Sequence, residues 1–482
     1  MKKAQIGMVG LAVMGENLAM NMESHGFTVA VYDVRPGVVE HFMQGRGAGK
    51  GFIGAHSWQE LADSLQPPRK VMLMIRAGEP VDQVIAQLLP VLAAGDTIID
   101  GGNSHFPDTI RRAQYVESQG LHYLGTGVSG GEEGALHGPS MMPGGSRAAW
   151  EQVKDIFQAI CAHVDGQPCC DYVGQDGAGH FVKMVHNGIE YGDMQLICEA
   201  YQLMKAGLEL DNEEMSRVFR QWNQTELCSY LIEITGDILS YRDEAGEYVL
   251  DQILDAAGQK GTGKWTGIAA LEEGVPLTLI GEAVFARCLS ARKEEREAAS
   301  KIYPHQKFSF AGDEQAMIEK IKGALFASKI ISYTQGYDLM RTAAGAYGWN
   351  LNYGGIALMW RGGCIIRSVF LNRIKEADED KPDLENLLLN DYFSNTIKEL
   401  VPAWREAVAF GISRGIPLPA MSSALAYFDG YTSNRLPANL LQAQRDYFGA
   451  HTYERVDRPR GEFFHTNWSG HGGKTAAGVY NA

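Results

Sequence analysis

The chain has 482 residues, and at about 150 residues per domain this length suggests roughly three domains. Hydrophobic residues make up 45% and charged residues 21%, which is an ordinary globular composition for a chain able to bury a large core. The net charge of −15 argues against binding to nucleic acid or to an anionic membrane surface. An anionic small substrate would therefore need a local cluster of Arg and Lys.

The seven cysteines are few, odd in number and irregularly spaced, which argues against a disulfide framework and for a reducing compartment. Cys169 and Cys170 are adjacent, but no second pair stands at zinc spacing, so no metal site is predicted. No apolar run approaches the about 18 residues that a membrane helix needs, and Glu16 and Asn17 interrupt the segment that resembles a signal peptide. We therefore expect a cytoplasmic protein.

Residues 1–176 alternate short apolar runs with helix-length segments, a pattern that predicts an α/β domain with a parallel sheet covered by helices on both faces. Helices are expected at Val81–Leu92 and Asp108–Ser118. The expected strands are Gln5–Val9, Thr28–Tyr32, Lys70–Ile75, Thr97–Asp100, His122–Leu124 and Asp171–Val173.

Residues 177–436 show long segments with a period near 3.6, such as Phe181–Ala206 and Glu314–Ala343, which predict an all-helical domain. Two similar hexapeptides, at residues 200–205 and 336–341, indicate an internal repeat, although Leu- and Tyr-rich helices can also match by coincidence. Residues 437–482 end in a glycine-rich stretch that makes neither a helix nor a core alone, so we expect it to be disordered or held by another subunit.

A dinucleotide-binding turn is predicted directly after the first strand. The residues Gly10, Leu11, Ala12, Val13, Met14 and Gly15 have the required glycine spacing, with alanine in place of the second glycine. Such a turn brings backbone N–H groups and a helix N-terminus to a pyrophosphate, whereas a plain glycine turn is the alternative. Asp33, at the end of the second strand, is a candidate to bind ribose hydroxyls, and Arg35 a candidate to bind a 2′-phosphate.

Three later turns are expected at the carboxyl ends of strands, where open α/β sheets bind ligands. They are Arg76–Gly78, Asp100–Asn103 and Val128–Gly131. Their glycines allow the backbone to approach a ligand, and Asn103 and Ser129 supply neutral hydrogen-bonding groups. Any one of these turns alone would be read as an ordinary loop.

The most informative segment is one predicted helix in which polar residues share a face. Lys183, His186, Asn187, Glu190 and Tyr191 stand at offsets 0, 3, 4, 7 and 8, so they span about 140°. A solvated face is the alternative, but histidine, asparagine and tyrosine are unusual choices for one. Partial burial would move the pKa values of the lysine and the glutamate toward neutrality, which suits a general base and a general acid.

The segment Gly258–Lys264 resembles the start of a phosphate-binding loop, but Trp265 stands where the magnesium-binding Ser or Thr would be, so nucleotide hydrolysis is not expected. Lys260 remains a candidate anion ligand. Arg287 and Arg445 lie in otherwise neutral sequence, where an arginine is more often a structural ion-pair partner than a ligand, so the sequence alone makes each a weaker candidate.

Together these residues resemble the decarboxylating 6-phosphogluconate dehydrogenase family over nearly the whole chain. The matching segments are Gly10–Gly15, Asp100–Asn103, Val128–Gly131, Lys183–Tyr191, Gly258–Trp265, Tyr353–Arg367 and Leu436–His451. The resemblance implies a Rossmann domain over 1–176, an all-helical substrate and dimerisation domain of two related halves over 177–436, and a tail over 437–482 that reaches the partner of a homodimer. It also implies oxidation of 6-phosphogluconate to ribulose 5-phosphate and CO2.

The resemblance assigns roles residue by residue. Lys183 would be the general base and Glu190 the general acid, with no metal. Substrate contacts would come from Asn103, Ser129, Gly130, Gly131, His186, Asn187, Tyr191, Lys260 and Arg287, with Arg445 and His451 supplied by the other subunit. Cofactor contacts would come from Gly10–Gly15, Asp33, Val34, Arg35, Ile75, Arg76, Ala77 and Asn103.

The expected cofactor is NADP by family membership, but the residues that follow the second strand depart from the family pattern. NADP-dependent members typically carry Asn-Arg-Thr or Asn-Arg-Ser there, whereas this chain has Asp33-Val34-Arg35. The carboxylate favours NAD, so use of both cofactors is expected. Two other functions remain open: a shorter-chain β-hydroxyacid dehydrogenase or imine reductase, which would not need the second helical half, and a catalytically inactive nucleotide sensor, which would not need Lys183 and Glu190.

Overall fold

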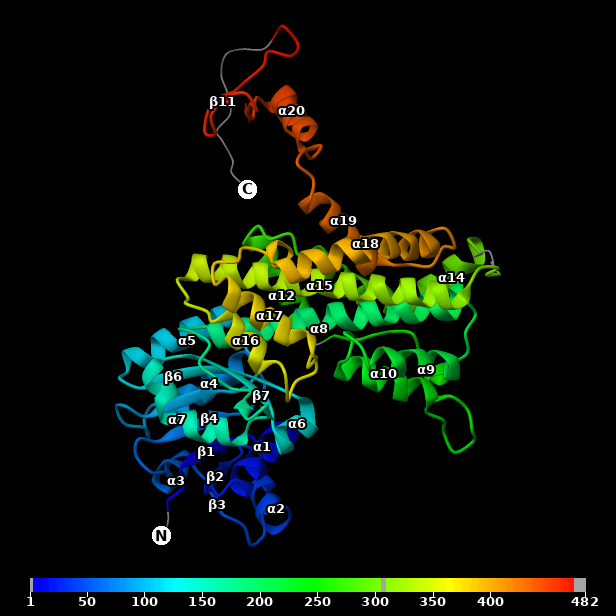
Figure 1. Ribbon diagram of the computed structural model, residues 1–482. Helices are drawn as coiled ribbons and strands as arrows, with labels where there is room; N and C mark the ends of the chain where they lie inside the picture. The colour runs from blue at the N-terminus through cyan, green and yellow to red at the C-terminus, as the bar shows by residue number, and fades with distance from the viewer. Residues whose placement is uncertain (1–2, 260, 305–308, 472–482) are drawn as a thin grey trace. The chain divides into compact units, whose positions relative to one another are not determined.

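The computed structural model describes residues 3–259, 261–304 and 309–471. The chain divides into two compact units, Met1–Ala424 and Leu425–Ala482. The first unit contains an α/β domain followed by a large helical domain, as the ribbon in Figure 1 shows. The predicted fold class is therefore confirmed.

The α/β domain is built on a seven-stranded sheet with the order β3-β2-β1-β4-β5-β6-β7. Strands β1 to β6 pair in parallel and β7 is antiparallel to β6. The order of the first six strands is that of the doubly wound dinucleotide-binding fold. The strands are β1 (Ile6–Val9), β2 (Val29–Tyr32), β3 (Phe52–Gly54), β4 (Lys70–Leu73), β5 (Thr97–Asp100), β6 (His122–Ser129) and β7 (Ser140–Gly145).

The sequence predictions for this sheet need three corrections. Asp171–Val173 is not a strand, because only single bridges from its flanking residues reach β7. The strand predicted at His122–Leu124 continues to Ser129, where two glycines had broken the apolar run. Strands β3 and β7 were missed because one has three residues and the other contains Pro143 and two glycines, so their pairing with neighbours decides their conformation.

Helices cover both faces of the sheet and enclose two apolar cores. One face packs against α1 (Val13–Ser24), α2 (Val38–Gln44), α6 (Gly131–His137) and α7 (Arg147–Ile160). The other packs against α3 (Trp58–Ser64), α4 (Glu79–Leu88) and α5 (Phe106–Ser118). A short hairpin, β8 (His163–Val164) and β9 (Gln167–Pro168), leads into the helical domain.

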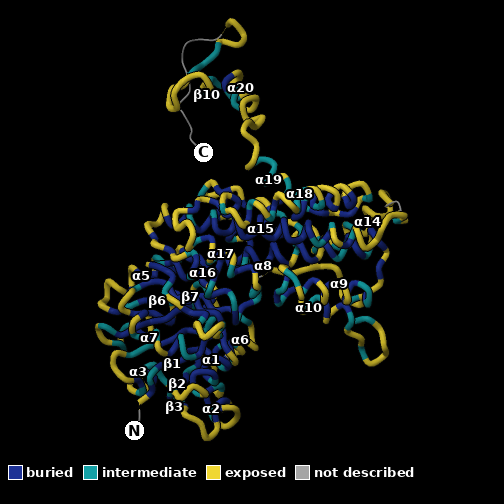
Figure 2. Tube along the Cα trace, viewed as in Figure 1, coloured by how far each residue is buried: buried dark blue, intermediate teal, exposed yellow. Residues whose placement is uncertain are grey.

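Two long helices, α8 (Ala178–Gln202) and α15 (Glu314–Tyr347), run through the helical domain and are largely buried, as the dark blue trace in Figure 2 shows. The two hexapeptides of the suspected repeat begin at Ala200 and Gly336, at the same offset from the start of their helices. The other elements are η1 (Leu203–Gly207), α9 (Asn212–Trp222), α10 (Tyr230–Ser240), α11 (Val249–Gln252), α12 (Thr262–Glu272), α13 (Thr278–Ser290), α14 (Lys293–Ile302), α16 (Tyr353–Met359), α17 (Phe370–Asp380), η2 (Leu387–Leu389), α18 (Asp391–Ile412) and α19 (Pro419–Tyr431).

The second unit consists of the end of α19, helix α20 (Ala438–Gly449) and the antiparallel pair β10 (Tyr453–Glu454) and β11 (Phe463–Phe464). Its centre is the fully buried carboxylate of Asp446. This carboxylate accepts hydrogen bonds from the backbone of Thr452 and Thr466 and from the side chains of His465 and Trp468. The described part of the glycine-rich end is therefore held within its own unit, a role of Asp446 that the sequence did not reveal.

All seven cysteines are free thiols. Within the described ranges, no helix is long and apolar enough to cross a bilayer. The cytoplasmic location expected from the sequence stays a prediction.

Candidate active site

The turn between β1 and α1 is shaped for close approach of a ligand to the backbone. Gly10 has a φ of 95°, and a Cβ atom there would lie 2.5 Å from the carbonyl oxygen of Met74. A Cβ atom on Gly15 would lie 1.9 Å from the carbonyl oxygen of Gly10. Both positions exclude a side chain, and the N-terminus of α1 that follows them suits a pyrophosphate.

Asp33, directly after β2, has both carboxylate oxygens engaged. Oδ2 accepts from the backbone N–H of Leu11 at 2.8 Å and from Nη2 of Arg35 at 2.8 Å. Oδ1 accepts from the backbone N–H and from Nε of Arg35, both at 2.9 Å. Burial opposes ionisation of Asp33, but these hydrogen bonds outweigh it and hold its pKa below the ordinary value. Asp33 thus ties the glycine turn to Arg35.

A cavity of about 1050 Å³ opens at this edge of the sheet. Its lining includes most of the predicted cofactor residues, namely Gly10, Ala12, Val13, Met14, Asp33, Val34, Arg35, Ile75, Arg76 and Asn103. The predicted residues Leu11, Gly15 and Ala77 are not part of the lining. Trp58, Gln83 and Gln87 line it as well, and no local sequence pattern indicates them because they come from helices α3 and α4. The size and the glycine turn fit a dinucleotide.

The polar face of α8 is buried, not solvated. Lys183 is 6% exposed and His186 is fully buried. Nζ of Lys183 donates to Oδ1 of Asn187 at 2.8 Å and lies 3.4 Å from Nδ1 of His186. Oε2 of Glu190 lies 3.9 Å from the same Nδ1 atom. The predicted face is therefore one connected cluster of polar groups.

Burial moves the pKa values of this cluster in the directions that proton transfer requires. It lowers the pKa of Lys183, and the charge of Glu190 offsets part of this shift. It raises the pKa of Glu190 against the opposing charges of Lys183 and Arg287. Burial and the neighbouring charge of Lys183 hold the pKa of His186 well below its ordinary value. A lysine whose pKa is lowered and a carboxylic acid whose pKa is raised suit a general base and a general acid.

Strand β6 joins the cavity to the polar face of α8. Val128 lines the cavity, and a Cβ atom on its neighbour Gly127 would lie 2.4 Å from Cβ of Lys183. The strand can therefore pass against Lys183 only because residue 127 has no side chain. Ser129, Gly130 and Gly131 follow at the end of the same strand and the start of α6. A substrate bound between the end of β6 and the polar face of α8 would contact both the cavity and Lys183.

Tyr191 and Arg287 form the other end of the site. The guanidinium of Arg287, on α13, lies 3.5 Å from the centre of the Tyr191 ring and donates to the carbonyl oxygen of Gly258 at 3.3 Å. The predicted ligand Lys260 lies outside the described residues. Arg445 and His451 belong to the second unit, where Arg445 donates to the side chain of Gln442 at 3.2 Å.

Thr262 was missed as a site residue. Its Oγ1 accepts from Nδ2 of Asn187 at 3.0 Å, which fixes the orientation in which the Asn187 oxygen faces Lys183. The signal was present, because Thr262 lies inside the glycine-rich segment Gly258–Lys264 that the sequence analysis singled out.

A parallel sheet with this strand order, a glycine turn at its switch point and an adjoining buried lysine define a Rossmann-fold oxidoreductase that uses a nicotinamide dinucleotide. The models of two domains match the chain: the NAD binding domain of 6-phosphogluconate dehydrogenase over residues 5–174 and the 6-phosphogluconate dehydrogenase C-terminal domain over residues 179–468. The chain belongs to the 6-phosphogluconate dehydrogenase family.

Similar proteins from distant organisms agree. The decarboxylating 6-phosphogluconate dehydrogenase of Aggregatibacter actinomycetemcomitans is 58% identical, covering 99% of both chains. The human decarboxylating enzyme is 56% identical, covering 100% of both chains. The solved structure of Plasmodium falciparum 6-phosphogluconate dehydrogenase, studied in complex with NADP+ and with 6-phosphogluconate, aligns with a TM-score of 0.93 at 45% identity and covers 96% of this chain and 100% of that one.

Proposed function

We propose that this protein oxidises and decarboxylates 6-phosphogluconate to ribulose 5-phosphate and CO2 at the polar face of α8. The observation that carries the proposal is the juxtaposition of buried Lys183 and partly buried Glu190 with a dinucleotide cavity across β6. Family membership and full-length similarity to decarboxylating enzymes support the same reaction.

Lys183 acts first as the general base. Its lowered pKa favours the neutral amine, which takes the proton from the C3 hydroxyl of the substrate. A bound nicotinamide dinucleotide supplies the hydride acceptor for C3. The product is a 3-keto acid whose carboxylate is β to the ketone, so CO2 leaves as its bonding electrons flow into the carbonyl. Lys183, now cationic, stabilises the enolate oxygen.

Glu190 completes the reaction as the general acid. Its raised pKa favours the protonated carboxyl group, which delivers a proton to the carbon that has lost CO2, as the electrons of the enediolate re-form the carbonyl group and yield ribulose 5-phosphate. Arg287 and Lys260 are proposed phosphate ligands, and Asn103, Ser129, His186, Asn187 and Tyr191 are proposed to hold the sugar. The Asn187 amide, fixed by Thr262, keeps the amine of Lys183 in place between the two steps.

The decisive experiment is the reduction of NADP or NAD, read at 340 nm, with purified protein and 6-phosphogluconate, together with measurement of released CO2. We expect both signals to appear in equal amounts. A folded protein that binds dinucleotide but gives neither signal would favour the nucleotide sensor. Oxidation of a non-phosphorylated β-hydroxy acid in preference to 6-phosphogluconate would favour the shorter-chain dehydrogenase class.

We further propose that the enzyme uses both NADP and NAD, with weaker discrimination than family members that carry Asn-Arg at positions 33 and 34. Asp33 repels a 2′-phosphate, and Val34 supplies no cation. Arg35 counteracts this repulsion because it pairs with Asp33 at 2.8 Å and its side chain is 57% exposed at the cavity. A carboxylate whose charge Arg35 neutralises, beside the exposed guanidinium of that same arginine, suits neither cofactor exclusively.

The active site is proposed to be shared between two subunits, with Arg445 and His451 supplied by the partner. Helix α20 exposes apolar side chains that a monomer would leave in water: Leu440, Leu441, Tyr447 and Phe448 are each more than half exposed.

Mixing Lys183→Met subunits with Arg445→Ala subunits should restore activity in hybrids that have one intact site. Absence of recovery after verified subunit exchange would contradict the shared site, and unchanged dimerisation and kinetics after truncation behind His451 would show that the last residues are dispensable.

A further inference from the structure

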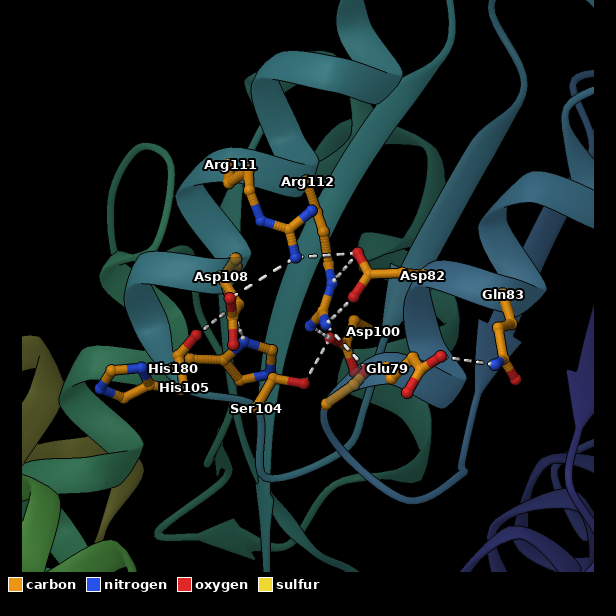
Figure 3. Close-up of polar contacts among 12 residues, drawn as sticks. Glu79, Asp82, Gln83, Asp100, Ser104, His105, Asp108, Arg111, Arg112 and His180 are labelled. Atoms are coloured by element: carbon orange, nitrogen blue, oxygen red, sulfur yellow. Dashed lines mark hydrogen bonds and ion pairs between the residues drawn. The ribbon is translucent and has the colours of Figure 1, made fainter.

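A polar network with a buried centre, which lies next to loops that line the dinucleotide cavity, has no part in the proposed chemistry, and Figure 3 shows its residues among their neighbours. At its centre is Arg112 on α5, a side chain that is 1% exposed. A buried guanidinium is costly unless several partners satisfy it. The positions of those partners indicate what the arginine does.

Arg112 is hydrogen-bonded to the turn between β4 and α4. Its Nη2 donates to the carbonyl oxygen of Gly78 at 2.8 Å and to Oδ2 of Asp82 at 2.7 Å, and its Nε donates to Oδ1 of Asp82 at 3.0 Å. Gly78 is the last residue of the turn that contains Ile75 and Arg76, both of which line the cavity. The arginine therefore fixes this turn at its backbone and at the start of α4.

The same guanidinium faces the next strand. Its Nη1 lies 3.7 Å from Oδ2 of Asp100, which is fully buried at the end of β5. Asp100 in turn accepts from the backbone N–H of Gly102 at 3.1 Å and from Oγ of Ser104 at 2.6 Å. Those residues bracket Asn103, a cavity residue proposed to contact both substrate and cofactor. One arginine thus connects both loops on this side of the cavity.

Helix α5 also contacts the catalytic helix. Oγ1 of Thr109, one turn before Arg112, lies 2.7 Å from Nδ1 of His180, and His180 lies one turn before Lys183 on α8. A single buried face of α5 therefore joins the cavity loops to the helix that carries the proposed base. Hydride transfer depends on the distance between these two parts, and an error of about 1 Å is enough to cost about 100-fold in rate.

We propose that Arg112 is a positioning residue for hydride transfer, which holds the loops 75–78 and 101–104 in the arrangement that presents the dinucleotide to the substrate. This proposal rests on the proposed function. Arg112 itself touches neither ligand, and its effect passes through Gly78, Asp82 and Asp100.

The test compares Arg112→Met with the matched control Arg111→Met. Arg111 is the preceding residue on α5 and pairs with Asp82 at 2.9 Å, but its side chain is 56% exposed and its ion pairs within the described ranges are to Asp82 and Asp108. Three quantities are measured on the full-length protein: the Kd of each dinucleotide by calorimetry, the Kd of 6-phosphogluconate, and the single-turnover rate of hydride transfer with substrate carrying hydrogen or deuterium at C3.

For Arg112→Met we expect a dinucleotide Kd raised about 10- to 100-fold, by analogy with the loss of metal affinity when a residue that orients a metal ligand is removed. Hydride transfer should slow and the deuterium effect on turnover should grow, whereas the Kd of 6-phosphogluconate should stay nearly unchanged. Arg112→Lys should fall between wild type and Arg112→Met because an ammonium keeps the charge but not the bidentate geometry. Arg111→Met should resemble wild type in all three.

The proposal is wrong if folded Arg112→Met binds dinucleotide and transfers hydride like wild type and differs only in melting temperature. Should that variant not fold, Ser104→Ala decides the question, because it removes only the hydrogen bond between Ser104 and Asp100. An unchanged dinucleotide Kd and hydride rate in Ser104→Ala would then overturn the proposal. Failure of the proposed function is a separate result, since wild-type protein would then reduce no cofactor with 6-phosphogluconate.

Discussion

The dinucleotide cavity and the polar face of α8 adjoin at β6, yet they differ in burial and in the groups that they offer to a ligand. The cavity is lined largely by backbone, glycines and apolar side chains, and among its charged residues the side chain of Arg35 is more than half exposed. The α8 face consists of titratable side chains taken out of water, with Lys183 and His186 almost fully buried. The cavity therefore offers a shape that fits a ligand, whereas the α8 face offers titratable groups with shifted pKa values.

This difference determines how each region fails when it is changed. A side chain added to the cavity turn blocks binding but leaves the pKa values of the acid and the base alone. Replacing a titratable side chain on α8 with an uncharged one removes a proton donor or acceptor. It also relieves the cost of burying a polar group, so the fold should become more stable. The predictions that follow test this contrast, from the largest expected effect to the smallest.

Lys183→Met should abolish hydride transfer, with a loss of about 10⁴-fold or more in turnover, and should raise the melting temperature. The folded-state pKa of Lys183 lies below its ordinary value because of burial, so wild-type stability falls as the pH drops below the unfolded-state value toward the folded-state one. The stabilisation by methionine should therefore be larger at neutral than at strongly alkaline pH. Calorimetric melting across pH measures it, with Lys301→Met, at an exposed position on α14, as the control. Near-wild-type turnover would show that Lys183 is not the base.

Glu190→Gln should lower turnover by about 10²- to 10⁴-fold, the range for loss of a general acid, while sparing hydride transfer more than turnover. Burial raises the pKa of Glu190, so wild-type turnover should fall as the pH rises through that pKa and the proton is lost. The variant should lack this alkaline limb and keep the acidic limb that we assign to Lys183.

The control for Glu190→Gln is Glu199→Gln, two turns further along α8. Glu199 is also buried, and burial raises its pKa to about 7, but its carboxylate accepts from the backbone N–H groups of Ala420 and Met421 and lies outside the site. Turnover measured against pH should keep its alkaline limb in this variant. If Glu199→Gln loses that limb and Glu190→Gln keeps it, the acid has been misassigned.

Gly10→Ala should weaken dinucleotide binding by about 100-fold or more, because the added methyl group displaces the turn from Met74 and from the pyrophosphate. The matched control is Gly26→Ala, since Gly26 has a similar φ of 88° but nothing within 4 Å of a Cβ atom. Gly26→Ala should lose only about 1–2 kcal/mol of stability through backbone strain, and it should bind dinucleotide like wild type. Calorimetric titration distinguishes the two, and equal Kd values would contradict the claim that a side chain at residue 10 blocks dinucleotide binding.

Substitutions at Asp33 and Arg35 should act mainly on the choice of cofactor. A charge-assisted contact is worth about 1.5–3 kcal/mol, so Arg35→Ala should reduce NADP preference by about 10- to 150-fold, while Asp33→Asn should shift preference toward NADP. The measurement is kcat/KM for NADP and for NAD on wild type and both variants. A wild-type preference for NADP above about a thousandfold would contradict the expected dual use, because one such contact is too weak to produce it.

The sequence predicted features that depend on near neighbours along the chain. The Gly10–Gly15 turn, the strand Thr97–Asp100 and the polar face of α8 follow from residues within a few positions of one another, because strand and helix periods are local. The same reasoning failed at Asp171–Val173, which looks like a strand but does not pair as one, and at β7, whose glycines and proline are extended because β6 pairs with them.

Only the tertiary structure decided which distant residues meet and which are removed from water. It placed Thr262 against Asn187, passed Gly127 against Lys183, and enclosed Arg112 between Asp82 and Asp100. It also shifted the pKa values of Lys183 and Glu190, since these shifts come from burial by segments far away in the chain. Local sequence sets backbone conformation through short-range sterics and hydrophobic periodicity, whereas desolvation and charge pairing arise only when remote elements pack together.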